Sequence, residues 1–330
     1  MARIVDVAAL AGVSTATVSR VLNGKAVRAD LEKAVRKAID ELGYTPNRTA
    51  RSLRRQHSEV IALVLPDIEN PFFTSLARGV EDIAQEAGLS VVLCNTDEDP
   101  DKQERYLRIA DDENMAGVIV APAGPSALLR HLTERERAVV VVDRAVPDDV
   151  DQVTFDNLEL GRRATRALAE RGFRRIACVT GPESTPTAVA RAQGWREELA
   201  EAGLPAPEDL LVHVNFRVDG GEDAMTRLLE LATPPDAVLA TNNLVGVGAL
   251  RVLSATDQVD LGLGIIGDLP FVTSPVDNVS LLQLRPREMG LSAARMLVQR
   301  IRGEAGPARQ IVQPTQPVRL GAPRESAPAR

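Results

Sequence analysis

The chain has little cysteine, few aromatic residues and few histidines, and each shortage argues against a class of protein. Its 330 residues include two cysteines and three histidines, and 3% are aromatic. Cys94 and Cys178 stand alone, so neither a disulfide framework nor a cysteine-based zinc site is expected. The histidines, His57, His131 and His213, lie on three unrelated segments without metal-ligand spacing. We therefore predict no metal, no cofactor and no catalytic residue, and a protein that is not an enzyme.

Long apolar runs and a secretory leader are also missing. No run of about 18 apolar residues occurs, which is the length that a membrane-spanning helix needs. The N-terminal residues lack the succession of a charged start, an apolar stretch and a small-residue cleavage site. A cytoplasmic protein without a membrane partner is therefore expected.

The formal net charge of -7 is unevenly distributed. The first 57 residues hold eleven Lys and Arg against five Asp and Glu, which gives +6 there and leaves -13 for the rest. A basic head on an acidic body indicates a polyanion-binding module joined to a part that does not bind polyanions, although a solvated helical surface would carry the same charge. We predict two domains, 1–57 and 58–330.

Three aliphatic stripes at helical spacing predict three short helices in the head, the first two joined by a glycine-containing turn. This layout is a helix-turn-helix, which places its second helix in the major groove of DNA. The predicted helix boundaries are Gly12 and Gly43 as ends and Ser14 and Asp30 as caps.

The second helix presents side chains suited to DNA. Thr15 and Ala16 at its tip and Arg20 one turn later would meet base edges. The alternative to a DNA-binding head is a helical bundle that binds protein or is purely structural. Phosphate contacts are expected from Thr17, Ser19, Asn23 and Lys25.

A basic segment, "RTARSLRR", follows the head and predicts a short hinge helix over about 46–55, capped by Asn47. Such a short, arginine-rich helix is marginal in water, so we expect it to fold on DNA, with Arg51 and Arg54 contacting the backbone. Leu53 is an apolar residue among these arginines. It is typical of a wedge that opens a base step from the minor groove, or else it packs on the following domain.

From Val60 onward, aliphatic strands alternate with amphipathic helices. This alternation predicts parallel sheets with helices on both faces, and ten strand segments, from "VIALVLP" to "SLLQL", fit two sheets better than one. Two such lobes hold ligands in the crevice at the carboxyl ends of their strands. Asp143 and Arg144 end one predicted strand. The candidate ligand residues at these junctions and on the neighbouring helix are Phe72, Phe73, Asp156, Arg191, Trp195, Phe216, Asn242 and Asp268.

Several stretches together resemble the LacI/GalR family of bacterial transcription regulators. They include "VDVAALAGVSTATVSRVLNG", "AIDELGYTPNRTARSLRR", "PDIENPFFTSLARGVEDIAQEAG" and "PDAVLATNNLVGVGALRVL", so the resemblance covers nearly the whole chain. It implies a repressor that reads a pseudo-palindromic operator as a homodimer, or as a tetramer built from two dimers. It also implies two lobes like those of periplasmic sugar-binding proteins, and an effector that controls DNA affinity.

By the same resemblance, Leu53 would be the minor-groove wedge, and the effector would be held by Asp156, Arg191, Phe216, Asn242 and Asp268. Carboxylates and an arginine suit a hydroxyl-rich ligand, which favours a sugar or sugar derivative, with a nucleobase as the alternative because of the phenylalanines.

Two local features complicate this interpretation. The segment "IIGDLPF" is two residues shorter than the family pattern, so the ligand-facing positions of Asp268 and Leu284 are left open. "GLGIIG" matches the dinucleotide fingerprint, but its last four positions are strand-like and Pro270 follows, which argues against NAD binding. A secreted solute-binding protein would lack the basic head, and an architectural DNA-binding protein would leave about 270 residues unexplained.

Overall fold

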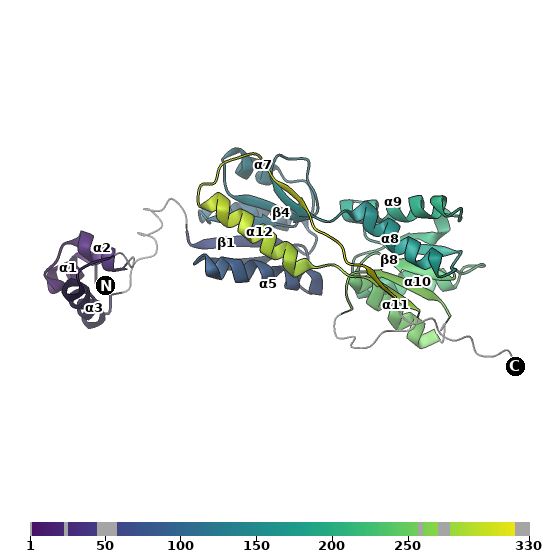
Figure 1. Ribbon diagram of the computed structural model, residues 1–330, viewed down its shortest axis with the longest axis horizontal. Coiled ribbons are helices and arrows are strands. Elements are labelled where there is room, and N and C mark those ends of the chain that lie inside the picture. Colours follow the sequence, from purple (N-terminus) through teal and green to yellow (C-terminus); the bar gives the residue numbers. More distant parts are fainter. Residues whose placement is uncertain (1, 23–25, 45–57, 257–259, 270–277, 321–330) are drawn as a thin grey trace. The chain divides into compact units, whose positions relative to one another are not determined.

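The computed structural model describes residues 2–22, 26–44, 58–256, 260–269 and 278–320. It divides the chain into two compact units, Met1–Ser58 and Glu59–Arg330, which we call the head and the body. The head is helical and the body contains both helices and strands (Figure 1).

The head contains three helices, α1 (Ile4–Ala11), α2 (Thr15–Leu22) and α3 (Ala29–Leu42), around a small aliphatic core. Gly12 ends α1 in the left-handed conformation with a φ of 63°, and the Ser14 hydroxyl accepts a hydrogen bond from the Thr17 amide at 3.2 Å. The predicted helix end at Gly12 and the predicted cap at Ser14 are therefore confirmed. The prediction of Asp30 as a cap is wrong, because α3 already begins at Ala29 and the Asp30 carboxylate pairs with Arg28 at 2.7 Å.

No single helix among the described residues is long and apolar enough to cross a membrane. Only α1 and α2 taken together reach that length and composition, and they are bent by 104° at their break.

The body has two six-stranded sheets. The first has the order β11-β5-β4-β3-β1-β2 and the second the order β12-β10-β9-β8-β6-β7. Neighbouring strands are parallel except β10 and β12. The strands of the first sheet are β1 (Val60–Leu65), β2 (Ser90–Asn95), β3 (Gly117–Val120), β4 (Val139–Asp143), β5 (Asp151–Thr154) and β11 (Gln310–Val312). Those of the second are β6 (Ile176–Thr180), β7 (Leu211–His213), β8 (Ala237–Ala240), β9 (Gly262–Ile266), β10 (Val279–Leu282) and β12 (Val318–Leu320).

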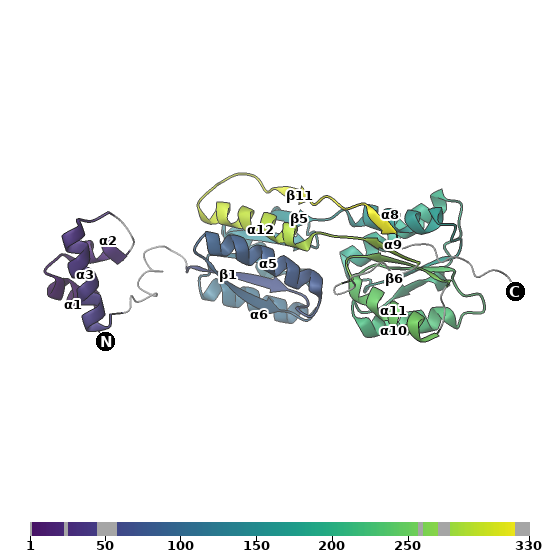
Figure 2. The same cartoon turned by 60° about the horizontal axis from the view of Figure 1, so that its bottom comes forward.

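Helices pack beside each sheet and make the two lobes of the body (Figure 2). The chain passes from one lobe to the other after β5, after β10 and between β11 and β12, so the late helix α12 packs on α5 in the first lobe. The first lobe contains α5 (Pro71–Glu86), α6 (Pro100–Asp112), α7 (Ala127–Glu134) and α12 (Pro286–Ile301). The second contains α8 (Asn157–Glu170), α9 (Pro186–Glu201), α10 (Val218–Leu229) and α11 (Asn243–Thr256).

The architecture confirms the predicted fold class of a helical head and two α/β lobes. The ten predicted strands form, and the central ones, such as β3, β4 and β9, are buried along their whole length, as expected for parallel strands covered on both faces. Because "GLGII" is itself the strand β9, the glycines there do not open a helix as a dinucleotide fingerprint requires. The two additional strands, β11 and β12, have only three residues each, which is too short for a period-2 pattern.

Candidate functional site

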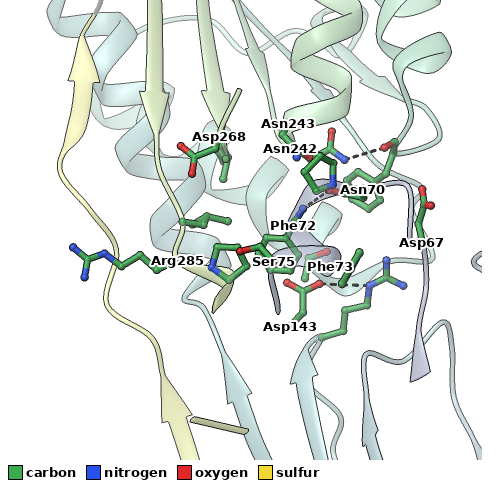
Figure 3. Close-up of a pocket in the computed structure, with 18 of the residues that line it drawn as sticks. Asp67, Asn70, Phe72, Phe73, Ser75, Asp143, Asn242, Asn243, Asp268 and Arg285 are labelled. Atoms are coloured by element: carbon green, nitrogen blue, oxygen red, sulfur yellow. Dashed lines mark hydrogen bonds and ion pairs between the residues drawn. The ribbon is translucent and has the colours of Figure 1, made fainter. Parts of the chain in front are cut away.

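The body contains a cavity of about 1040 Å³ that is lined by residues of both lobes. Polar side chains reach it from the carboxyl ends of four parallel strands: Asp67 after β1, Asp143 at the end of β4, Asn242 after β8 and Asp268 after β9 (Figure 3). Loops at the carboxyl ends of parallel strands are where α/β folds bind ligands. The topology therefore explains why residues more than 200 positions apart in the chain surround one space.

The aromatic part of the cavity is positioned by the start of α5. Asn70 caps this helix, with its Oδ1 accepting a hydrogen bond from the Phe72 amide at 2.9 Å, and Pro71 occupies the first helical position. Phe72 is half-buried at the cavity wall. Its ring meets Phe73 edge-on, with the ring centres 5.0 Å apart, while Phe73 is almost wholly in the core. A fixed aromatic face thus borders the cavity.

Two adjacent charged residues at the end of β4 are almost completely buried. Asp143 has a φ of 64°, an unfavourable conformation for a residue other than glycine. Burial raises the pKa of its carboxyl, while Arg144 and Arg191 oppose that rise. The two terminal nitrogens of Arg144 donate to the Glu98 carboxylate, each at 2.6 Å, and one also donates to the Pro122 carbonyl at 2.9 Å. The charge of Arg144 is therefore already paired with Glu98.

Arg191 is a second buried cation at the cavity, and its hydrogen-bond partners are neutral. Its Nε donates to Asn157 Oδ1 at 2.9 Å and its Nη1 to the Thr241 carbonyl at 2.7 Å. Burial lowers the pKa of the guanidinium, and the nearby Asp143 carboxylate opposes that shift. A buried guanidinium held by neutral acceptors favours an electronegative oxygen of a ligand as its further partner.

The second lobe presents an amide and a carboxylate to the same space. Asn242 donates from Nδ2 to the Phe216 carbonyl at 3.0 Å and accepts from the Val245 amide at 2.8 Å, which holds its side chain at the start of α11. Asp268, which follows the neighbouring strand β9, accepts a hydrogen bond from Gln283. Both residues of that pair line the cavity, as does Leu284, so the shortened "IIGDLPF" segment still brings Asp268 to it.

In the head, α2 separates its buried side from an exposed one. Val18 and Val21 are in the core, whereas Thr15, Ala16 and Arg20 are exposed and Thr17 and Ser19 half-buried. A helix with an exposed hydroxyl and methyl group in its first turn and an exposed guanidinium in its last turn has the side chains that major-groove recognition uses.

Comparison with known proteins identifies both units. Residues 3–47 match the family of bacterial regulatory proteins of the lacI type, and residues 58–320 match the periplasmic binding proteins and sugar-binding domain of the LacI family. The chain belongs to the LacI family. It is therefore a DNA-binding transcriptional repressor under the control of an effector, and not an enzyme.

Individual relatives of this LacI-family repressor match along nearly their whole length. A ribose operon repressor of Halalkalibacterium halodurans is 34% identical over 305 residues, 91% of each chain. The regulator CelR of Thermobifida fusca is 36% identical over 327 residues, 95% of this chain and 93% of the relative.

Solved structures also match along nearly the whole chain. A CelR–cellobiose complex superposes with a TM-score of 0.72 at 32% identity, covering 97% of this chain and 99% of that one. The lac repressor dimer bound to operator and the anti-inducer ONPF has a TM-score of 0.82 at 22% identity, covering 97% of this chain and 98% of that one, and it shows the shared fold.

The structure brings six of the eight candidate effector residues of this LacI-family repressor to the cavity. Asp156 and Trp195 are the two that do not line it. The Asp156 carboxylate caps α8, accepting from the Glu159 amide at 3.0 Å. Trp195 is fully buried and donates to the Ile176 carbonyl at 3.1 Å. The six that line it are Phe72, Phe73, Arg191, Phe216, Asn242 and Asp268.

The cavity of the LacI-family repressor also contains charged residues that strand-end reasoning did not single out. Arg217 of the second lobe forms an ion pair with Asp97 of the first lobe and lies 3.9 Å from the Asp67 carboxylate. This ion pair links the two lobes beside the ligand space. Arg217 could have been predicted from the sequence, because it directly follows Phe216 at a junction already predicted to face the ligand. The remaining DNA-contact candidates, Asn23, Lys25, Asn47, Arg51, Leu53 and Arg54, lie outside the described residues, as does the predicted hinge helix.

Because Asp156 acts as a helix cap, Asp156→Ala is expected to lower the free energy of unfolding of this LacI-family repressor by about 1 kcal/mol without changing its effector affinity. Asp156→Asn keeps the acceptor and is expected to be nearly neutral. Urea denaturation and calorimetric titration of both variants test this. A loss of effector affinity in Asp156→Ala, with stability unchanged, would assign the carboxylate to the ligand instead.

Proposed function

We propose that this repressor binds a pseudo-palindromic operator as a homodimer and that a sugar or sugar derivative in the cavity controls its affinity for DNA. The observation that carries the effector class is the buried Arg191, hydrogen-bonded to neutral acceptors and facing a space bordered by Asp143, Asn242 and Asp268. Sugar hydroxyls both donate and accept, so one ligand can bind an arginine, an amide and carboxylates at once. The faces of Phe72 and Phe216 can cover the apolar side of a sugar ring.

The relatives support this effector class. One relative is named as a ribose operon repressor, and the solved structure of CelR is a complex with cellobiose, so the two sugars are a monosaccharide and a disaccharide. The cavity volume, about 1040 Å³, is at the upper end of the usual range for small-molecule sites and accommodates either size. The Asp268–Gln283 pair supplies polar groups from the second lobe for the same ligand.

For DNA, we propose Thr15, Ala16 and Arg20 as base readers and Leu53 as a wedge in the minor groove. The support is the exposed side of α2 and the basic head, whose charge of +6 attracts a polyanion. Such a protein would act in the cytoplasm, where the bacterial chromosome lies. Phosphate contacts are proposed for Thr17, Ser19, Asn23, Lys25, Asn47, Arg51 and Arg54.

For the proposed homodimer, the first lobe offers a contact surface at the edge of its sheet. Strand β2 lies at the edge of the first sheet, and it exposes Val92 and Leu93, with about 41% and 44% of each residue accessible. Edge strands of monomers usually carry charge or proline to prevent pairing, so exposed aliphatic residues there favour cover by a second copy.

Selection of bound sequences from random DNA tests the proposal, followed by anisotropy titration of the selected operator with ribose, cellobiose and nucleobases. We expect a pseudo-palindromic site and a change of about tenfold or more in affinity with one of the sugars. Arg20→Ala is expected to relax the base preference at one position per half-site and to weaken the best site by about 5- to 150-fold.

Arg36→Ala is the matched control, because Arg36 is exposed on α3 and paired with Glu32 at 2.7 Å. It should leave base preference unchanged. Unchanged selection by Arg20→Ala would refute the base-reading role, and a response to a nucleobase alone would replace the sugar by the alternative effector class.

A further inference from the structure

The ring of Phe216 occupies the space that a side chain at Gly181 would need. Gly181 follows β6 and is buried, and a Cβ atom built there would lie 2.2 Å from Cζ and 2.4 Å from Cε2 of Phe216. Nonbonded carbon atoms do not approach each other this closely. Glycine therefore allows the outer edge of the ring to lie directly against the backbone of residue 181.

The backbone on both sides of this contact is held by hydrogen bonds. The Val214 amide donates to the Thr180 carbonyl at 2.9 Å, and His213 Nδ1 lies 2.7 Å from the Gly181 carbonyl oxygen. The Phe216 carbonyl accepts from Asn242, whose own Oδ1 caps α11. A Cβ at position 181 would thus displace the ring more readily than the main chain.

The Phe216 ring borders both Gly181 and the ligand cavity. Phe216 lines the ligand cavity and Gly181 does not, so the ring lies between Gly181 and the ligand space. A ring displaced from Gly181 would enter the cavity. The backbone itself does not require glycine here, since Gly181 is absent from the residues with a left-handed φ in the described chain.

We infer that Gly181 is a specificity-determining positioning residue: by lacking a side chain it seats the Phe216 ring and sets the width of the cavity. This inference rests on the proposed function, in which the cavity binds the effector. Widening or narrowing a pocket by about one methyl group changes ligand preference by about tenfold or more.

A double-mutant cycle separates this role from a general structural one. Gly181→Ala is expected to weaken ribose or cellobiose binding by about tenfold or more, and to weaken the larger sugar more. Phe216→Leu removes the ring atoms that would collide, so adding Gly181→Ala to it should change affinity by less than about twofold. Isothermal titration calorimetry measures all four proteins. An equal loss in both backgrounds would overturn the inference.

Gly124→Ala is the matched control, because a Cβ at Gly124 would meet only the Pro100 ring, at 3.2 Å, away from the cavity lining. It should leave sugar affinity unchanged.

A second measurement does not depend on any sugar. In protein labelled with ¹³C-phenylalanine, Gly181→Ala should shift the ring signals that disappear in Phe216→Leu. Failure of every sugar to bind the wild type would contradict the proposed effector class, whereas an unshifted Phe216 signal would contradict the role of Gly181.

Discussion

Arg191→Met is expected to abolish the effector response of this repressor while leaving operator binding intact. Methionine fills a similar volume but removes the charge and the donors of a buried guanidinium. Hydrogen bonds to a charged group contribute about 1.5–3 kcal/mol each, so if Arg191 gives the effector two of them, as proposed, their loss weakens effector binding by more than about 100-fold. The Asn157 and Thr241 acceptors also lose their donor, and some stability is lost with them.

The matched control is Arg196→Met, the same change on the same helix. Arg196 is half-exposed and paired with Glu208 at 2.7 Å, and it does not line the cavity. Anisotropy titration of operator DNA, with and without the effector, measures both variants, and thermal unfolding shows whether each one is folded. A normal effector response in folded Arg191→Met would exclude Arg191 from the site.

Asp151→Asn is expected to destabilise the first lobe by about 3–5 kcal/mol. The Asp151 carboxylate is nearly inaccessible and accepts from Arg300 at 2.8 and 2.9 Å and from Arg309 at 2.7 Å. It therefore ties β5 to α12 and to the segment before β11. An amide would leave Arg300 without its paired carboxylate and Arg309 with only Glu304, 3.6 Å away. Urea denaturation measures the loss of stability. The control is Asp209→Asn, because Asp209 is half-exposed and paired with Arg175; this change is expected to cost less than about 1 kcal/mol.

The same carboxylate predicts a pH dependence. Although burial opposes ionisation, hydrogen bonds from Arg300 and Arg309 lower the pKa of Asp151 from 3.8 to about 2. A depressed folded-state pKa stabilises the fold above the unfolded-state value, and that stability is lost as pH falls from about 4 to about 2. The stability difference between wild type and Asp151→Asn should shrink over this range. A stability difference that stays constant from pH 5 to pH 3 would contradict an ionised Asp151 carboxylate paired with Arg300 and Arg309.

Local patterns predicted most of the fold because they act over a few residues. Aliphatic spacing located α1 to α3, and the buried strands appeared as continuous apolar runs. Two residues show the limit of such patterns. Asp30 was predicted to cap α3 but pairs with Arg28, whereas Asp156, a candidate for ligand binding, caps α8 and does not line the cavity.

Charge and periodicity are properties of neighbouring residues, so they sufficed to predict the basic head, the alternation that makes two α/β lobes, and the polar residues at strand ends. Tertiary structure alone decided which of these residues share the cavity. Arg191 and Trp195 are one turn apart on α9, yet the packing of that helix brings the first to the cavity and the second under the Ile176 carbonyl. Gly181 acquires its role only because β6 and β7 are paired, which places the Phe216 ring against it.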